Sequence, residues 1–187
     1  MAERTPVFEM HIRPLFRLLD RQHMLRVRSD LDLWNYDAVK SFATVIGRKI
    51  GQPNPSMPTA DAGGAWPSEW VALFNRWAQG GFRRLAPAAG RDYKLVKAAD
   101  GRCTLSCKVD IPDTDQGDSV AWLDVVSAGP PTASYQLLVY PGEVVPPAAQ
   151  TIEVTCLERV DPASAAAGVT VVDANGTHIV NLEPLVA

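Results

Sequence analysis

The segment Ile12-Arg-Pro-Leu-Phe-Arg-Leu-Leu-Asp20-Arg-Gln-His23-Met24 decides how the first half of the chain is interpreted. Through this segment and just before it, helical spacing places one set of side chains on a single face: Phe8, Ile12, Leu15, Phe16, Leu19 and His23. The spacing predicts a helix over residues 6–23, with Thr5 as its N-cap. Pro14 has no amide hydrogen and its ring clashes with the preceding turn, so we expect it to kink this helix or to mark its true start.

Two further helices are expected in the first half of the chain. One is predicted over residues 36–50, because Asn35 can cap it, apolar residues recur at helical spacing and Gly51 follows. The other is predicted over residues 67–79, where it opens at a proline and ends at Gly80-Gly81. Three helices before residue 86 predict a small helical domain.

The composition changes near residues 86–91 to short alternating runs separated by Gly, Pro, Asp and Asn, which are typical of strands. Seven strands are expected, over residues 93–98, 102–110, 120–127, 134–140, 151–160, 168–172 and 177–182. Asn175-Gly176 favours a tight hairpin turn between the last two. This spacing predicts an antiparallel β-sandwich that resembles the immunoglobulin architecture. The expected fold class is therefore α+β with two domains, a helical domain at 1–86 and a β-sandwich at 91–187.

The helical half resembles the haem-carrying domain of small c-type cytochromes, because it has motifs of that family in the same order. The motifs are the opening helix at 12–24, the segment Leu31-Asp-Leu-Trp-Asn-Tyr36-Asp-Ala-Val-Lys40, the loop Ser56-Met57-Pro58 and the closing helix Pro67-Ser-Glu-Trp-Val-Ala-Leu-Phe-Asn-Arg-Trp77-Ala-Gln-Gly80. The resemblance covers most of the first domain and implies a cytochrome c-like helical fold.

The haem-attachment motif of that family is missing here. In the family, the opening helix leads into Cys-x-x-Cys-His, which holds haem through two thioether bonds and an imidazole. These positions are Asp20-Arg-Gln-His23-Met24 in this chain, so no haem cofactor is expected. Met57 matches the family's distal ligand, and we expect it to fill a gap in the core. Haem held without covalent bonds by Met57 with His11 or His23 is an alternative.

Asp20 and His23 are also candidates for acid–base chemistry. They are three residues apart on the predicted helix, where side chains meet, and an imidazole beside a carboxylate suits proton transfer near neutral pH. Tyr36 is the third candidate catalytic residue. The alternative is that Asp20 and His23 form a local salt bridge or cap. No metal site is predicted, because His11 and His23 would lie about 18 Å apart on a continuous helix.

Four of the five tryptophans lie in the helical half, at Trp34, Trp66, Trp70 and Trp77. We expect them to fill the volume that haem occupies in the family. The alternative is an aromatic pocket for a planar small-molecule ligand.

The three cysteines, Cys103, Cys107 and Cys156, lie in predicted strands. Residues four apart on one strand are about 13 Å apart, so Cys103 and Cys107 should not bond each other. Cys156 could bond either of them across the sheet, but three buried thiols are the favoured interpretation for a cytoplasmic chain.

Charge and composition exclude several classes of partner. The chain has 187 residues, a net charge of −3 and 47% hydrophobic residues, and its basic residues alternate with acidic ones. We therefore expect no nucleic-acid partner. No apolar run approaches the roughly 20 residues of a membrane span, and the start lacks a signal-peptide pattern. The expected location is cytoplasmic, with no membrane association.

No recognised catalytic motif is present. The expected function is therefore a non-catalytic accessory or protein-interaction module. The chain resembles domains that accompany bacterial oxidases, including copper oxidases of the tyrosinase type, so an oxidase or a biosynthetic enzyme is the expected partner. The alternative is a small-molecule biosynthetic enzyme, a lyase, cyclase or isomerase, that uses the former haem cavity with Asp20, His23 and Tyr36.

Overall fold

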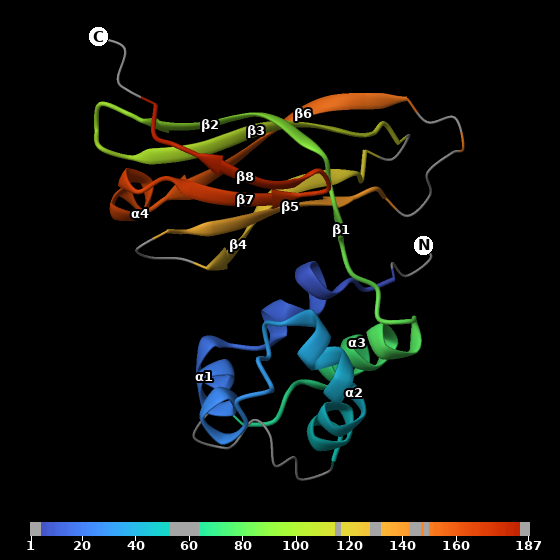
Figure 1. Cartoon of the computed structure of the whole chain (residues 1–187). Helices are drawn as coiled ribbons and strands as arrows, with labels where there is room; N and C mark the ends of the chain where they lie inside the picture. The colour runs from blue at the N-terminus through green and yellow to red at the C-terminus, as the bar shows by residue number, and fades with distance from the viewer. Residues whose placement is uncertain are drawn as a thin grey trace. The chain divides into compact units, whose positions relative to one another are not determined.

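The computed structural model describes residues 5–52, 64–114, 117–127, 132–142, 147 and 150–183. The chain divides into two compact units, Met1–Leu85 and Ala86–Ala187. Helices α1, α2 and α3 belong to the first unit and the strands belong to the second, as Figure 1 shows. The fold class is α+β, as expected from the sequence.

Two of the three predicted helices are confirmed. Helix α2 spans Tyr36–Ile50, and the side chain of Asn35 caps it by accepting a hydrogen bond from the Ala38 amide (2.9 Å). Helix α3 spans Ser68–Gln79 and ends at Gly80. The capping residues and the glycines therefore placed these helices correctly.

The single helix predicted over residues 6–23 is wrong, because the chain forms three short pieces there. A π-helical turn, Phe8–Ile12, leads into a 3-10 turn, Arg13–Leu15, and α1 follows at Leu18–Val27. Pro14 lies at the start of the 3-10 turn, where its missing amide interrupts helical hydrogen bonding. Phe16 is extended (φ −91°, ψ 109°), so the backbone changes direction before α1 begins.

This break changes which side chains of α1 face the interior. Asp20 and Met24, four residues apart, are buried on the inner face. Leu19 and His23, which the spacing placed inward, are exposed. Leu18 and Leu19 are 51% and 50% exposed, so an apolar pair lies at the start of α1 in contact with solvent.

Aromatic rings fill the centre of the helical unit. The rings of Phe8 and Phe74 lie 5.7 and 5.6 Å from the ring of Trp77, which is fully buried. Trp66 and Phe16 join the same cluster, with their ring centroids 5.2 Å apart. The cluster also contains the inner side chains of α2, namely Val39, Ala43, Ile46 and Ile50.

Two sheets form the second unit. The three-stranded sheet has the order β2 (Gly90–Lys97), β3 (Cys103–Pro112) and β6 (Thr151–Val160). The five-stranded sheet contains β1 (Ala86–Pro87), β4 (Val120–Ser127), β5 (Ser134–Tyr140), β7 (Val169–Asp173) and β8 (Gly176–Val180). A short helix, α4, Pro162–Ala166, connects β6 to β7. The seven predicted strands are confirmed within three residues of their expected ends, and β1 was not predicted.

Strand β5 pairs with β7 in parallel, whereas the other pairs of named strands in the described residues are antiparallel. Ser134 lies opposite Thr170 and Gln136 lies opposite Val172. The expectation of a purely antiparallel arrangement is therefore wrong at this pair. Parallel neighbours need a long connection, and here β6 of the other sheet and α4 lie between β5 and β7 in the chain.

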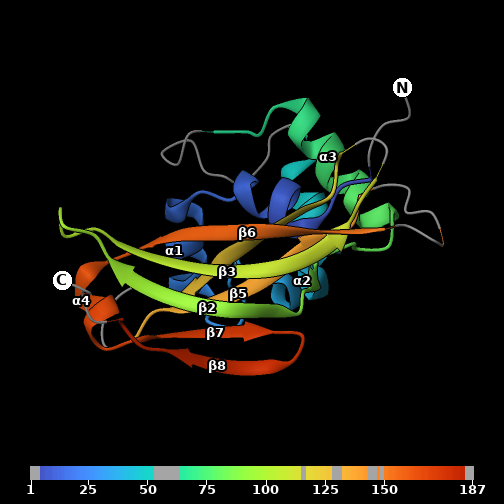
Figure 2. The same cartoon turned by 90° about the horizontal axis from the view of Figure 1, so that it is seen from above.

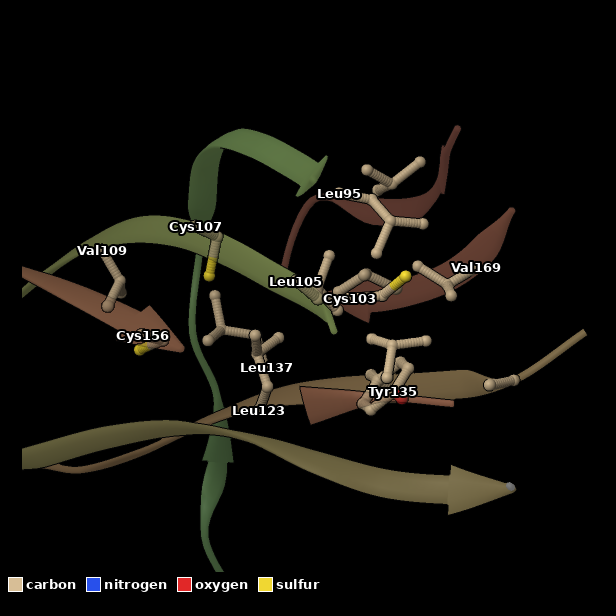
Figure 3. Packing of buried hydrophobic residues seen from close by; sticks show 14 of the residues in the cluster. Leu95, Cys103, Leu105, Cys107, Val109, Leu123, Tyr135, Leu137, Cys156 and Val169 are labelled. Carbon is tan, nitrogen blue, oxygen red and sulfur yellow. The ribbon is translucent and has the colours of Figure 1, made fainter. Parts of the chain in front are cut away.

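The two sheets share one apolar core. Figure 2 shows β2, β3 and β6 side by side in one layer. The inner face of β3 holds Cys103, Leu105, Cys107 and Val109, as its alternation predicted. Figure 3 shows these side chains packed with residues of the five-stranded sheet, including Leu123, Tyr135, Leu137 and Val169.

Replacing Trp77 with alanine should lower the free energy of unfolding by about 3–5 kcal/mol, because a fully buried ring is removed and a cavity remains. Urea unfolding followed by far-UV circular dichroism measures the loss. Val45→Ala is the control, since Val45 is an exposed residue of α2. Equal losses in the two variants would contradict the role of the aromatic cluster.

Candidate functional site

Asp20, the first predicted site residue, caps the beginning of α1. Its Oδ2 accepts hydrogen bonds from the Arg17 amide (3.0 Å) and from Arg17 Nε (2.9 Å), and its Oδ1 accepts one from Arg17 Nη2 (3.0 Å). Both carboxylate oxygens are therefore engaged by one residue of the preceding turn. The predicted alternative of a local ion pair fits this geometry, with Arg17 rather than His23 as the partner.

His23 and Tyr36 do not join Asp20 in a hydrogen-bonded group. His23 is exposed on α1, and within the described residues no hydrogen bond links its ring to Asp20 or Tyr36. The Tyr36 hydroxyl donates to the carbonyl of Phe82 (2.7 Å), and its ring packs edge-on against Phe8 at 5.6 Å. The structure thus gives Tyr36 a packing role and leaves His23 in solvent.

Two neighbours of Asp20 and His23, namely Arg21 and Met24, make structural contacts. Arg21 forms two hydrogen bonds of 2.7 Å to Asp32, and its guanidinium also stacks on Trp34. Hydrogen bonding to Arg21 lowers the pKa of Asp32. Met24 is buried in the aromatic cluster. Met57 lies outside the described residues.

An open depression of about 440 Å³ lies on the helical unit. It is lined by Ser29, Asp30, Asp32, Asn35, Asp37, Ala38, Ser41 and Phe42. Arg28 and Arg21 pair with two of its carboxylates, Asp30 (2.9 Å) and Asp32 (2.7 Å). None of the three predicted catalytic residues lines it, so it does not correspond to the expected site.

A second polar cluster, which the sequence did not predict, is centred on Asp173 at the end of β7. Its Oδ2 accepts hydrogen bonds from the Gly90 amide (2.9 Å) and the Tyr93 hydroxyl (2.7 Å), and its Oδ1 lies 3.0 Å from His178 Nε2. A Cβ atom at Gly90 would collide with the Tyr93 hydroxyl and lie 2.6 Å from Leu137 Cδ2. Glycine is therefore required where β2 approaches Asp173.

The turn after β7 supplies the remaining donors. Oδ1 of Asp173 accepts hydrogen bonds from the amides of Asn175 (2.7 Å) and Gly176 (3.1 Å). A carboxylate that binds amides two and three residues later stabilises a tight turn. Asp173 thus closes the β7–β8 hairpin and also holds β2 from the other sheet.

A bulge in β2 brings Tyr93 to this position. Asp92 has a positive φ of 53°, and the register with β3 shifts between Arg91 and Lys94. The Tyr93 ring then stacks on the His178 ring, with 4.8 Å between centroids. The bulge is the local feature that connects the two sheets through polar groups.

The electrostatics of the cluster keep Asp173 ionised. Burial by itself raises the pKa of Asp173, but hydrogen bonds from Tyr93, Gly90, His178 and Asn175 outweigh it and lower the pKa to about 2. Burial and the bond to Asp173 raise the pKa of Tyr93. A carboxylate has about four lone-pair sites, and five donors surround this one, so it has no free oxygen for proton transfer. The cluster fits a structural role.

Only part of this cluster has a signal in the sequence. Asp173 and Gly176 mark a turn, but Tyr93 lies about 80 residues earlier, in another sheet. Among the described residues, no group of three or more His, Cys, Asp and Glu side chains is placed to hold a metal ion.

Replacing Asp173 with asparagine should lower the free energy of unfolding by about 2 kcal/mol at pH 7, because a shift of nearly two pKa units in a buried carboxylate is lost. The pKa of Asp173 is depressed in the folded state, so its contribution is present above pH 4 and is lost as the pH falls from about 4 to 2. Urea unfolding of the unmodified chain and of Asp173→Asn at pH 7 and pH 3 measures this loss. The difference in free energy of unfolding between the two proteins should be smaller at pH 3.

Asp110→Asn is the matched control, because Asp110 is exposed and pairs with Arg91 (2.7 Å) on the outer face of the sheet. Exposed ion pairs contribute about 0–1 kcal/mol. A pH-independent loss in the Asp173 variant, or an equal loss in the control, would exclude the proposed charge effect.

Comparisons of the chain with protein-family models, with curated proteins and with solved structures give no match. Within the described part of the chain, no helix has the length and apolar character needed to span a bilayer. The functional argument therefore depends on the residues and contacts of this chain.

Proposed function

We propose that the chain is a non-catalytic accessory or protein-interaction module whose partner is a bacterial oxidase or a biosynthetic enzyme. In this proposal, the helical unit is a cytochrome c-like scaffold without haem, and the strand unit is an immunoglobulin-like β-sandwich. The observation that carries the proposal is the aromatic cluster at the centre of the helical unit.

The aromatic cluster supports a scaffold that has exchanged haem for side chains. Trp77, Phe74 and Phe8 are packed ring against ring, and Trp66 extends the cluster towards Phe16. Large planar rings can occupy the volume of a planar cofactor and bury a similar apolar area. Met24 adds a thioether to this interior at the position of the lost iron ligand.

The shared core of the two sheets supports the sandwich proposal. Alternate residues of β3 and β5 face each other across it, which is typical of two sheets packed face to face. The parallel pair β5–β7 departs from the antiparallel immunoglobulin pattern. The proposed likeness to the immunoglobulin architecture therefore concerns the two packed sheets and not the pairing of every strand.

The contacts of the predicted catalytic residues favour the accessory role over the enzyme alternative. Arg17 engages both oxygens of Asp20, and the Tyr36 hydroxyl is bonded to a backbone carbonyl. A general base needs a free lone pair within hydrogen-bonding reach of its substrate. Of these three residues, Asp20 is buried, Tyr36 is half-buried and His23 is exposed on the outer face of α1.

The exposed pair Leu18 and Leu19 is our candidate contact for the partner. The two side chains are adjacent and half exposed at the start of α1, and the partner surface that would cover them is apolar. Burying two half-exposed leucines contributes about 1–2 kcal/mol to binding, which is roughly a tenfold change in Kd.

The partner test uses the tagged full chain to purify bound proteins from an extract of the source organism. An oxidase or biosynthetic enzyme should co-purify in stoichiometric amounts. The purified partner should bind the variant Leu18→Ser/Leu19→Ser about tenfold more weakly in calorimetry, whereas Val45→Ser should bind as the unmodified chain does. If the chain alone converts a substrate and His23→Ala abolishes this activity, the enzyme alternative replaces the proposal.

Titration of the full chain with haemin tests the haem-free scaffold. We expect no saturable Soret shift, because aromatic side chains occupy the interior. Stoichiometric haem binding that is lost in Met57→Ala, and in His11→Ala or His23→Ala, would contradict the proposal.

A further inference from the structure

Two free cysteines lie directly opposite each other on neighbouring strands. Cys107 of β3 is the register partner of Cys156 of β6, and neither cysteine is in a disulfide. Their residues are 1% and 4% exposed, and Figure 3 shows both side chains on the inner side of the sheet. From the sequence, Cys156 could bond either Cys103 or Cys107. The register between β3 and β6 places Cys107 opposite Cys156.

The backbone spacing of this pair is suitable for a disulfide. Opposite residues of an antiparallel pair have Cα atoms about 4.5–5.5 Å apart, and disulfides span about 4.4–6.8 Å. The Asp113 amide donates to the carbonyl of Gln150 (2.7 Å) in the same register. Asp113 and Gln150 are therefore a hydrogen-bonded pair, and hydrogen-bonded pairs recur at every second residue along an antiparallel ladder. Cys107 lies six residues before Asp113, so Cys107 and Cys156 are also a hydrogen-bonded pair, with an expected Cα separation of about 5.5 Å. Their Cβ atoms would have to approach by about 1 Å.

Cys103 does not share this arrangement. It lies opposite Val160, and its Sγ is 3.9 Å from the carbonyl of Gly101. It is buried on the same face of β3 as Cys107, but about 13 Å along the strand. Cys103 is therefore a matched control thiol in the same core.

We propose that Cys107 and Cys156 form a reversible cross-strand disulfide when the protein meets a low-molecular-weight disulfide such as oxidised glutathione. This inference rests on strand register and does not depend on the proposed function. It assigns a redox modification site to the strand unit, with small disulfides as the co-reactant class.

The reaction proceeds by two thiol–disulfide exchanges. One cysteine loses its proton, and its thiolate attacks a sulfur of oxidised glutathione, which expels one glutathione thiolate and leaves a mixed disulfide. The thiolate of the second cysteine then attacks the protein sulfur of that mixed disulfide and expels the second glutathione thiolate. Two protein thiols are oxidised, one disulfide is reduced to two thiols, and the released protons pass to the departing thiolates.

Access to the pair requires local opening of β6. The hydrogen bond with the Cys156 thiol and burial raise the pKa of Cys107, and both thiols are shielded from a dissolved disulfide in the closed core. Strand β6 lies at the edge of the three-stranded sheet and pairs only with β3 among the described strands of that sheet. Separation of this edge strand exposes both thiols together. The bond should therefore form slowly and close a loop that contains β4 and β5.

The test treats the full chain with oxidised glutathione, blocks the remaining thiols and maps tryptic peptides by mass spectrometry. The expected product has lost two hydrogens, about 2 Da, and contains one internal disulfide. Trypsin releases Cys103 and Cys107 together in peptide 103–108, and Cys156 in peptide 109–159. The variant Cys103→Ala therefore assigns the bond, because only Cys107 remains in the first peptide.

The proposal expects the linked peptides in the unmodified chain and in Cys103→Ala, and their absence in Cys107→Ala and Cys156→Ala. Oxidation should also raise Tm by several degrees in the first two proteins, since the loop is closed in the unfolded chain. Glutathione adducts without a linked pair, a link that disappears in Cys103→Ala, or a fall in Tm on oxidation would each overturn the proposal. Addition of dithiothreitol should restore the original mass and Tm.

Discussion

The carboxylate of Asp20 holds the backbone amide of Arg17, and the orientation of α1 follows from this contact. Pro14 has already interrupted helical bonding, so α1 begins anew and its faces do not continue those of the preceding turns. Each helical residue turns the side-chain direction by about 100°, which directs Met24 inward and His23 outward. One local cap thus decides which side chain of residues 20–24 enters the core.

Polar groups at the edge of the aromatic cluster fix its position. The indole of Trp77 donates to the carbonyl of Arg83 (2.8 Å), and the Tyr36 hydroxyl donates to that of Phe82 (2.7 Å). Buried Trp and Tyr side chains need such partners. The cluster is therefore anchored to the segment after α3 as well as packed, which gives the proposed interaction module a rigid scaffold.

The sequence predicts best the elements that neighbouring residues determine. Asn35 marks the start of α2, and Asn175 with Gly176 marks the β7–β8 turn. The Phe8–Ile12 turn was mistaken for part of a helix, because its apolar spacing fits either structure. The polar cluster at Asp173 could not be predicted, since it needs a bulge in β2 and contacts across about 80 residues. The ion pair between Asp20 and Arg17 could not be predicted from helical spacing either, because it depends on where α1 begins.

The parallel pairing of β5 with β7 has a consequence for the order of folding. The hairpins β2–β3, β4–β5 and β7–β8 join strands that are consecutive in the chain, so they close short loops and form early. Pairing of β7 with β5 closes a longer loop that contains β6 and α4, so we expect it to form later. Until then, the Ser134–Gln136 part of one edge of β5 is exposed, because β1 covers only the Leu138–Val139 part. We expect the newly made chain to be most prone to aggregate at this step.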